Sequence, residues 1–471
     1  MLTLLLGFIT FPILTRLLSR EEYGILGLVT NTIAIATAFA KGGLSDGIIR
    51  FYREYAASPD RLTLFTSTVV TRGVILAAIV TSAYVLLLPQ INALTGVDSR
   101  YLVCFLVMGL YLFVRPLNII VLNYLRALGK LFLYNAVNVG TRALGIALAL
   151  SLLFWLIGEL YGYFLGLALA EVSATIVLYR WLLSTHRYSP SQVSGPLALN
   201  LFKFGLPLLL TELSYLLLSY SDRFLIVAFH GEDMLGLYNV GYNVPLYVND
   251  LVMFSLSYAV IPIYTELYTR EGKEATEKFL TRSLNYYLMV VIPLCAGYVA
   301  VASDALVILA SNKYAEAAAF SPIILAGLVC LGMNSILYAG LYLQKKSGHI
   351  LAVMLAAVAA NIAVNVALLP KYGATGAAIA TLTACALSSV LMGILGRKHL
   401  RVSISLKTVL YYSIVSALMY LLLRVIDLGN PIFNLGVKVP LGMLVIGVAV
   451  LAREAELRTQ VILVIQKLKN R

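Results

Sequence analysis

Continuous apolar runs of roughly 20 residues recur along the whole chain, separated by short polar segments. An α-helix needs about that length to cross the hydrocarbon core of a bilayer, whereas a transmembrane barrel would alternate apolar and polar residues over about ten positions. The pattern therefore predicts an all-α polytopic membrane protein with fourteen crossings. The predicted spans are 1–18, 24–52, 63–88, 101–124, 131–156, 159–182, 203–228, 236–262, 284–310, 320–343, 350–369, 374–396, 407–424 and 433–452.

The two ends of the chain differ from the spans between them. No basic segment precedes the first apolar run and no A-x-A site follows it, so we expect a helix there and not a cleaved signal peptide. Residues 454–471 mix acidic and basic side chains with Val, Ile and Leu, and they are too polar to span. We expect this tail to be an amphipathic helix on the cytoplasmic membrane surface.

Composition supports the membrane assignment. Of 471 residues, 61% are apolar and only 12% are charged, where a soluble domain is about a quarter charged. The formal charge of +13 is of the size seen in nucleic-acid-binding proteins, but the basic residues lie mostly in short clusters between apolar runs. The sequence therefore predicts no nucleic-acid partner, and membrane lipids as its surroundings.

The distribution of the 35 basic residues predicts the orientation. With both termini in the cytoplasm, 23 of them fall in inner segments and eight in outer segments, as the positive-inside rule requires. We therefore expect a multi-pass protein of the cytoplasmic membrane with both termini cytoplasmic. The remaining four cations, Lys41, Arg72, Arg115 and Arg142, lie in the interior of predicted spans, away from the span ends.

Residues typical of enzymes and metal sites are scattered. The four cysteines (Cys104, Cys295, Cys330 and Cys385) all lie in apolar segments without C-x-x-C spacing, and the four histidines are isolated. Phosphate-binding loops, nucleophile elbows and H-E-x-x-H helices are absent from the sequence. We therefore expect a transporter without catalytic residues, resident metal or cofactor.

The two halves of the chain repeat one another. Gly129 matches Gly348 at an offset of 219, and a weaker similarity relates residues 15–26 to residues 222–238. Six helices per copy is an even number, so both copies start on the same membrane side, as in a parallel repeat about an axis along the membrane normal. The predicted organisation is a six-helix lobe over 1–184, a cytoplasmic linker over 185–202, a second six-helix lobe over 203–398, two further helices over 399–453 and the tail over 454–471.

Three segments carry a family resemblance. TRLLSREEYG (15–24), FGLPLLLTELSYLLLSYSDRFLI (204–226) followed by GEDMLGLYNVGYNV (231–244), and NIAVNVALLPKYGATGAAIAT (361–381) resemble polysaccharide flippases of the multidrug/oligosaccharidyl-lipid/polysaccharide exporter superfamily. The resemblance covers nearly the whole chain. It implies movement of an oligosaccharide linked to a lipid phosphate or diphosphate across the membrane, with polysaccharide assembly enzymes as partners.

The in-span cations are candidates for substrate binding. Arg72, Arg115 and Arg142 lie at comparable depth, and Lys41 precedes the helix-breaking Gly42-Gly43. A charge at this depth needs a wet cavity or a partner, and the planar guanidinium fork suits phosphate oxygens. The functional hypothesis is an electropositive cavity for the lipid-linked phosphate. The structural alternative is that Arg72 and Arg115 snorkel, or pair with the carboxylates of the first lobe, Asp46 and Glu171.

Acids within spans are candidates for ion coupling. Glu212 and Asp250 could bind a proton or sodium ion that drives the cycle, or could instead join helices by hydrogen bonds. Two other substrate classes stay open: a lipid-linked peptidoglycan precursor, which suits a basic cavity equally well, and an organic cation in a cation-coupled multidrug exporter, which would prefer an acidic one. A membrane glycosyltransferase would need catalytic acids or a large outer loop, and the outer loops are short.

Overall fold

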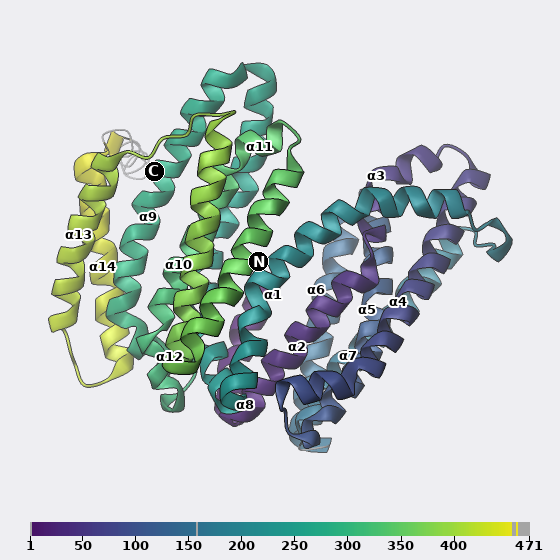
Figure 1. The fold of residues 1–471 in the computed structure, drawn as a ribbon, viewed down its shortest axis with the longest axis horizontal. Helices are drawn as coiled ribbons and strands as arrows, with labels where there is room; N and C mark the ends of the chain where they lie inside the picture. Colours follow the sequence, from purple (N-terminus) through teal and green to yellow (C-terminus); the bar gives the residue numbers. More distant parts are fainter. Residues whose placement is uncertain (1, 157–158, 455–457, 460–471) are drawn as a thin grey trace, which may run out of the picture. The chain divides into compact units, whose positions relative to one another are not determined.

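Long helices joined by short turns make up residues 2–156, 159–454 and 458–459, which the computed structural model describes (Figure 1). The helices are α1 (Leu2–Leu17), α2 (Arg20–Lys41), α3 (Leu44–Tyr55), α4 (Pro59–Thr95), α5 (Leu102–Ala127), α6 (Leu131–Ser151), α7 (Leu160–Thr185), α8 (Gly195–Arg270), α9 (Gly272–Leu309), α10 (Ser321–Leu337), α11 (Ala339–Leu343), α12 (Ser347–Arg397), α13 (Leu406–Val425) and α14 (Pro431–Arg453). These described residues contain no strand. The all-α prediction is confirmed.

Eleven helical segments of the described chain are long and apolar enough to span a membrane. The labels α8 and α12 each cover two of the predicted spans, because each consists of two helices that meet at a kink, where Gly231 (φ 78°) and Gly373 (φ 52°) leave the helical conformation. The shorter apolar helix Leu5–Leu17 accounts for the first predicted span. Fourteen apolar segments therefore correspond to the fourteen predicted spans, and the chain is a multi-pass membrane protein.

The second predicted span is broken where the sequence indicated. α2 begins at a capping box, in which the Ser19 hydroxyl accepts from the Glu22 N–H and the Glu22 carboxylate accepts from the Ser19 N–H. It ends at Lys41, because Gly42 (φ 53°) and Gly43 (φ 71°) both adopt the left-handed conformation that glycine tolerates best. The short helix α3 then continues in a new direction.

The internal repeat is visible in the turns that precede α6 and α12. Gly129 (φ 74°) and Lys345 (φ 54°) are both left-handed, and in each turn the next N–H donates to the carbonyl five residues earlier at 2.9 Å. Lys345, at an offset of 216, is therefore the structural counterpart of Gly129. The alignment of Gly129 with Gly348 is three residues out of register, because a lysine occupies the left-handed position where glycine is usual.

The chain divides into two compact units. The first comprises Met1–Asn239 with Asn361–Ala377, and the second comprises Val240–Ala360 with Ala378–Arg471. The lobe boundaries inferred from the repeat stay a prediction. The amphipathic tail expected over 454–471 lies almost entirely outside the described residues.

Small residues set the spacing of α6 and α7 in the first unit. A side chain at Gly166 of α7 would overlap the backbone of Ala149, and one at Gly145 of α6 would touch Ala170 at 3.5 Å. Close helix packing through glycine and alanine is the usual substitute for hydrophobic burial within a bilayer. It holds α6, which carries Arg142, against α7, which carries Glu171.

In the second unit, α13 and α14 pack on α9 (Figure 1). The Lys438 ammonium of α14 lies 3.0 Å from the Asp304 carboxylate of α9, and the Asn434 amide donates to the same carboxylate at 3.1 Å. Lys438 is only 7% exposed. A charge removed from water is tolerated when it is paired and hydrogen-bonded, so this cluster attaches the final helix to the unit.

Candidate functional site

Five of the six predicted site residues belong to the first unit. Lys41 ends α2, Arg72 lies in α4, Arg115 in α5, Arg142 in α6 and Glu212 in the first part of α8. The sixth residue, Asp250, lies after the Gly231 bend and belongs to the second unit. The residues assigned to phosphate binding are thus all carried by one unit, on four different helices.

Lys41 and Glu212 form an ion pair. The Lys41 ammonium lies 2.6 Å and 2.8 Å from the two carboxylate oxygens of Glu212, although 171 positions separate the residues in the sequence. The pair forms where the helices cross, because Gly43 and Gly205 lack side chains and their backbones approach so closely that a Cβ on either would overlap the other. The Lys41 side chain is 16% exposed and that of Glu212 is 39% exposed. The candidate phosphate ligand and the candidate coupling acid therefore neutralise one another.

Arg115 is held by a carboxylate from α7. Its Nη1 atom donates to Glu171 Oε1 at 2.9 Å, and the amide of Asn118 donates to the other carboxylate oxygen at 2.5 Å and to the Glu171 carbonyl at 3.1 Å. This is the pairing that the structural alternative expected. Asn118 was not among the site residues predicted from the sequence, although its position three residues after Arg115 places both side chains on one face of the helix.

Arg72 and Arg142 are arranged differently. Both are exposed at the surface of the first unit, and neither has a carboxylate within ion-pair distance among the residues that the structure describes. Tyr111 lies near both Arg115 and Arg142, which places these two cations in one electrostatic neighbourhood. The acid Asp46 lies in the field of Lys41, Glu212 and Arg126, so charges of both signs interact around the Lys41–Glu212 pair.

The first unit also contains a buried polar cluster on two of the three segments that carry the family resemblance. Arg223 Nη1 lies 2.8 Å from Asp222 Oδ1, and the Tyr238 hydroxyl donates to Asp222 Oδ2 at 2.5 Å. Asn361 Oδ1 accepts from Ser221 at 3.2 Å. Asp222, Arg223 and Asn361 are each at most 3% exposed. This cluster fixes the first part of α8 against residues 361–377 by interior hydrogen bonds.

A reciprocal backbone contact joins the beginning of α2 to the segment after the Gly231 bend. A Cβ on Gly24 would overlap the Glu232 carbonyl, and a Cβ on Gly236 would overlap the Arg20 carbonyl. Gly236 follows Gly24 by 212 positions, and Glu232 follows Arg20 by the same number. The weak sequence similarity between residues 15–26 and 222–238 thus corresponds to two copies of one motif that contact each other through equivalent positions. Both motifs lie at helix ends expected to face outward.

The match to a family model decides the membership of the chain. The model described as polysaccharide biosynthesis protein matches residues 1–268, which is more than half of the chain. The chain belongs to this family. This membership agrees with the resemblance to polysaccharide flippases that the three segments carry.

Individual relatives agree with this assignment. An uncharacterized membrane protein of Methanocaldococcus jannaschii is 24% identical over 403 residues, covering 80% of this chain and 79% of the relative. A probable flippase, AglR of Haloferax volcanii, is 26% identical over 185 residues, covering 39% of this chain and 38% of its own.

Two solved structures share the fold. The inward closed conformation of the lipid II flippase MurJ has a TM-score of 0.80 at 16% identity and covers 97% of both chains. An inward-facing multidrug resistance transporter of the MATE family has a TM-score of 0.69 at 16% identity, covering 84% of this chain and 94% of its own. This polysaccharide biosynthesis family member therefore has the fold of the multidrug/oligosaccharidyl-lipid/polysaccharide exporter superfamily, while its substrate has to be argued from its own residues.

Proposed function

We propose that this protein is a flippase that moves an oligosaccharide linked to a lipid phosphate or diphosphate from the cytoplasmic to the outer leaflet by alternating access. One observation carries the proposal: four cations lie on α2, α4, α5 and α6 of the first unit, and only two of them are paired with carboxylates among the described residues. The family description, polysaccharide biosynthesis, supports a glycan as cargo.

The state of Arg115 suits phosphate binding. Glu171 engages only Nη1 of its guanidinium, and fixing one edge of the planar fork orients the other edge. Arg72 and Arg142 add charge that is exposed and unpaired with carboxylates in the described part of the chain. A phosphate that reaches these groups replaces water as their partner, which stabilises an anion at a depth where an isolated charge is costly.

Glu212 and Asp250 are the proposed coupling acids, for a proton or a sodium ion. In the case of Glu212 the contact with Lys41 supplies a mechanism: a proton or cation on the carboxylate weakens the ion pair and frees the ammonium for the substrate phosphate. Loading of the coupling ion and of the substrate then occur at one helix crossing. Asp250 is half-buried and has no ion-pair partner among the described residues.

A lipid-linked peptidoglycan precursor is the second candidate substrate. It is favoured by the similarity to the lipid II flippase, which extends over α13 and α14 because it covers 97% of this chain. A multidrug exporter fits less well, because an organic cation would meet Lys41, Arg72, Arg115 and Arg142 with the same sign of charge. We place the protein in the cytoplasmic membrane with both termini inside, next to the enzymes that build and consume the lipid-linked glycan.

Reconstituted vesicles test the substrate. Purified protein is offered a lipid-diphosphate-linked oligosaccharide, a lipid-linked peptidoglycan precursor and a cationic dye, and arrival in the opposite leaflet is read with a membrane-impermeant sugar-modifying enzyme or by dye efflux. We expect transfer of the oligosaccharide-linked lipid, and its loss in the Arg115→Ala/Arg142→Ala double variant. Transfer of the peptidoglycan precursor alone would favour the second candidate, and efflux of the dye alone would refute an anionic substrate.

A further inference from the structure

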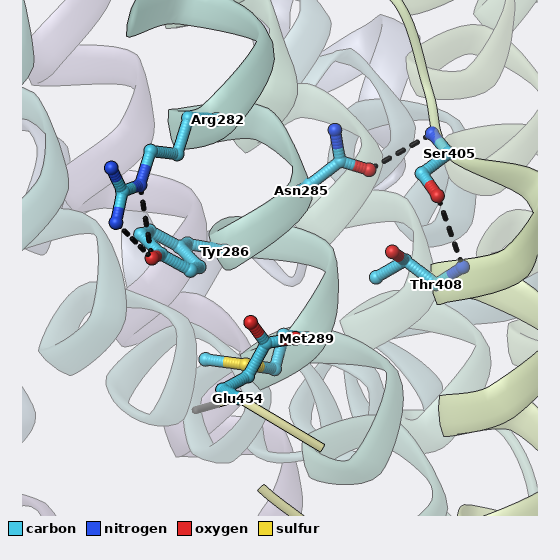
Figure 2. A pocket seen from close by; sticks show the side chains of 7 residues that line it. All are labelled: Arg282, Asn285, Tyr286, Met289, Ser405, Thr408 and Glu454. Atoms are coloured by element: carbon cyan, nitrogen blue, oxygen red, sulfur yellow. Dashed lines mark hydrogen bonds between the residues drawn. The ribbon is translucent and has the colours of Figure 1, made fainter. Parts of the chain in front are cut away.

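A polar cavity of about 460 Å³ lies in the second unit, where α9, the beginning of α13 and the end of α14 meet (Figure 2). Its polar lining residues are Arg282, Asn285, Tyr286, Ser405, Thr408 and Glu454. A volume of this size is typical of a site for a small molecule or for part of a larger one. None of these residues belongs to the proposed phosphate site of the first unit.

The cavity lies at the membrane–water boundary. The predicted spans of α9 and α13 begin at 284 and 407, and that of α14 ends at 452, so all three helices reach the bilayer surface beside the cavity. Apolar residues follow at once: Val290 of α9 and Leu410 of α13 are 45% and 54% exposed. A molecule that places a polar group here and an apolar chain along these residues has the dimensions of a membrane lipid.

Ser405, which lines the cavity, ends an extended segment that is held by α9. The side chains of Glu277, Thr281 and Asn285, spaced one helical turn apart, accept from the backbone N–H groups of residues 401, 403 and 405 at 2.8, 3.3 and 2.9 Å. Three bonds at regular spacing leave this segment little freedom to collapse inward. The cavity is therefore a built feature of the unit.

Three hydroxyl groups in the lining are prepared to donate. The Tyr286 oxygen accepts from Arg282 at 2.8 and 3.0 Å, the Ser405 oxygen accepts from the Thr408 N–H at 3.2 Å, and the Thr408 oxygen accepts from Arg453 at 3.2 Å. Each oxygen thus accepts a hydrogen bond from a neighbour, while its own O–H group has no acceptor among the described residues. Figure 2 shows Arg282 and Tyr286 on one side of the space, and Ser405 and Thr408 on the other.

The charges around the cavity favour an anion that also carries a hydrogen-bond donor. Arg282 polarises the Tyr286 hydroxyl, and Arg453 does the same for Thr408, so two cations stand behind the donating groups. The Glu454 carboxylate lines the other edge, 3.7 Å from Arg453. A phosphate with one negative charge meets the donors, and a hydroxyl or ammonium beyond it meets the carboxylate.

We propose that this cavity binds the phosphodiester head group of a membrane phospholipid. The phosphate contacts Arg282 and the Tyr286, Ser405 and Thr408 hydroxyls, the donor beyond it contacts Glu454, and the acyl chains follow the outer faces of α9 and α13. The bound lipid occupies the junction of α9 with α13 and α14. It is a resident of the protein, separate from the transported substrate.

Native mass spectrometry of the full-length protein in detergent tests the site. The probes are phosphatidylglycerol, whose head group carries hydroxyls beyond the phosphate, phosphatidylcholine, which has no such donor, and inorganic phosphate. The test variants are Arg282→Met and Tyr286→Phe/Thr408→Val. Lys278→Met is the matched control, because it removes one cation from the same helix at an exposed position outside the cavity.

We expect retention of phosphatidylglycerol in preference to phosphatidylcholine, with at least a fivefold loss of the bound fraction in both test variants and no loss in the control. A thermal melt without added lipid confirms that each variant is folded. Equal retention in all variants would overturn the proposal. The proposal would also be overturned if inorganic phosphate raised the melting temperature as much as phosphatidylglycerol does, since that would show an anion site without a lipid.

Discussion

At the scale of single residues, the cations within the spans differ in what neutralises them. Lys41 and Arg115 each meet a carboxylate at 2.6 and 2.9 Å, whereas Arg72 and Arg142 have no such partner in the described part of the chain. A phosphate must displace a carboxylate to reach Lys41 fully, whereas at Arg142 no carboxylate of the described residues has to be displaced. We therefore expect the individual cations to contribute unequally to substrate binding.

The proposed phosphate contacts predict a graded response to substitution. Export should fall about tenfold or more in Arg142→Ala and in Arg115→Ala, because a charge-assisted bond to phosphate is worth ~1.5–3 kcal/mol. Lysine at either position should restore only part of it, since the paired geometry of the guanidinium is lost. The measurement is export of the glycan at matched protein levels. Normal export in the double alanine variant would remove these residues from the mechanism.

The Lys41–Glu212 pair predicts how coupling fails. Glu212→Gln should flatten the dependence of transport on an imposed proton or sodium gradient while leaving binding of the lipid-linked sugar intact, because the amide neither takes up a proton nor carries the negative charge that attracts a sodium ion. The measurement compares transport in vesicles with and without the gradient. Asp250→Asn is measured in the same way, because Asp250 is the second candidate acid. If Glu212→Gln keeps the full gradient dependence, Glu212 has only a structural role.

His186 predicts a pH dependence of stability. It follows α7 and contacts Tyr52 and Trp181, with its Nε2 atom 3.4 Å from the Tyr52 hydroxyl. Burial lowers the pKa of His186 below its usual value of 6.5. The unfolded chain therefore binds a proton more readily than the folded one, so stability should decrease as the pH falls below 6.5.

Thermal melts in detergent between pH 7.5 and 5 measure this effect. We expect His186→Phe to reduce the decrease in melting temperature at the acid end, since phenylalanine retains the ring contacts and does not titrate. His349→Phe, at an exposed position, is the control and should behave as the unmodified protein. If the melting temperature of His186→Phe fell at low pH as much as that of the unmodified protein, other groups would be the cause of the decrease.

At the scale of elements, the repeat is expressed as a contact between equivalent helix beginnings. Gly24 packs on the carbonyl of residue 232, and Gly236 packs on that of residue 20. Reciprocal contacts of this kind follow when two copies of one motif meet about an approximate two-fold axis. The glycines are required there by the approach of a backbone carbonyl.

This contact predicts an unusual response to alanine. In an open helix, Gly→Ala stabilises by about 1 kcal/mol, and Gly447→Ala should do so because a Cβ there meets nothing within 4 Å. Gly24→Ala and Gly236→Ala should instead lower the melting temperature to a similar extent, because each added methyl overlaps a carbonyl of the other copy. A stabilising effect at either glycine would contradict the packing described here.

At the scale of the whole molecule, the proposed alternating access requires the helix ends that are expected to face outward to separate during the cycle. Beside the glycine contact, Arg20 Nη1 lies 3.7 Å from Asp233 Oδ2, and the Asp98 N–H donates to Glu232 at 3.0 Å. The ion pair holds the beginning of α2 against the segment after the Gly231 bend, and the hydrogen bond holds the turn before α5 against the same segment. An ion pair near the surface, such as this one with Asp233 57% exposed, contributes only ~0–1 kcal/mol, so opening it is inexpensive.

Crosslinking tests this requirement. Arg20→Cys/Asp233→Cys, bridged by a reducible bifunctional thiol reagent, should stop transport, and reduction should restore it. Arg50→Cys/Glu54→Cys is the control, because it joins two positions one turn apart within α3 and limits no opening. Transport that continues with the Arg20–Asp233 bridge intact would rule out separation of these ends as a step of the cycle.

The amino-acid sequence alone determined the membrane class, the all-α fold, the number of spans and the family. Each of these depends on the residues of one local segment. About 20 consecutive apolar residues make insertion of a helix favourable wherever that helix packs, and Gly42-Gly43 ends α2 because glycine readily adopts the left-handed conformation. The repeat was also visible in the sequence. The alignment of the two copies was three residues out of register at Gly129, because its counterpart Lys345 adopts a left-handed conformation that is not expected of a lysine.

The tertiary structure decided which charges meet. Lys41 and Glu212 are 171 positions apart, and nothing in either helix alone selects one as the partner of the other. The close approach of Gly43 and Gly205 at the helix crossing does so, just as the packing of α5 on α7 brings Arg115 to Glu171. Hydropathy is a property of one helix, whereas an ion pair within about 3 Å is a property of two helices packed in one register. The sequence could therefore name the charged residues, and only the packing could pair them.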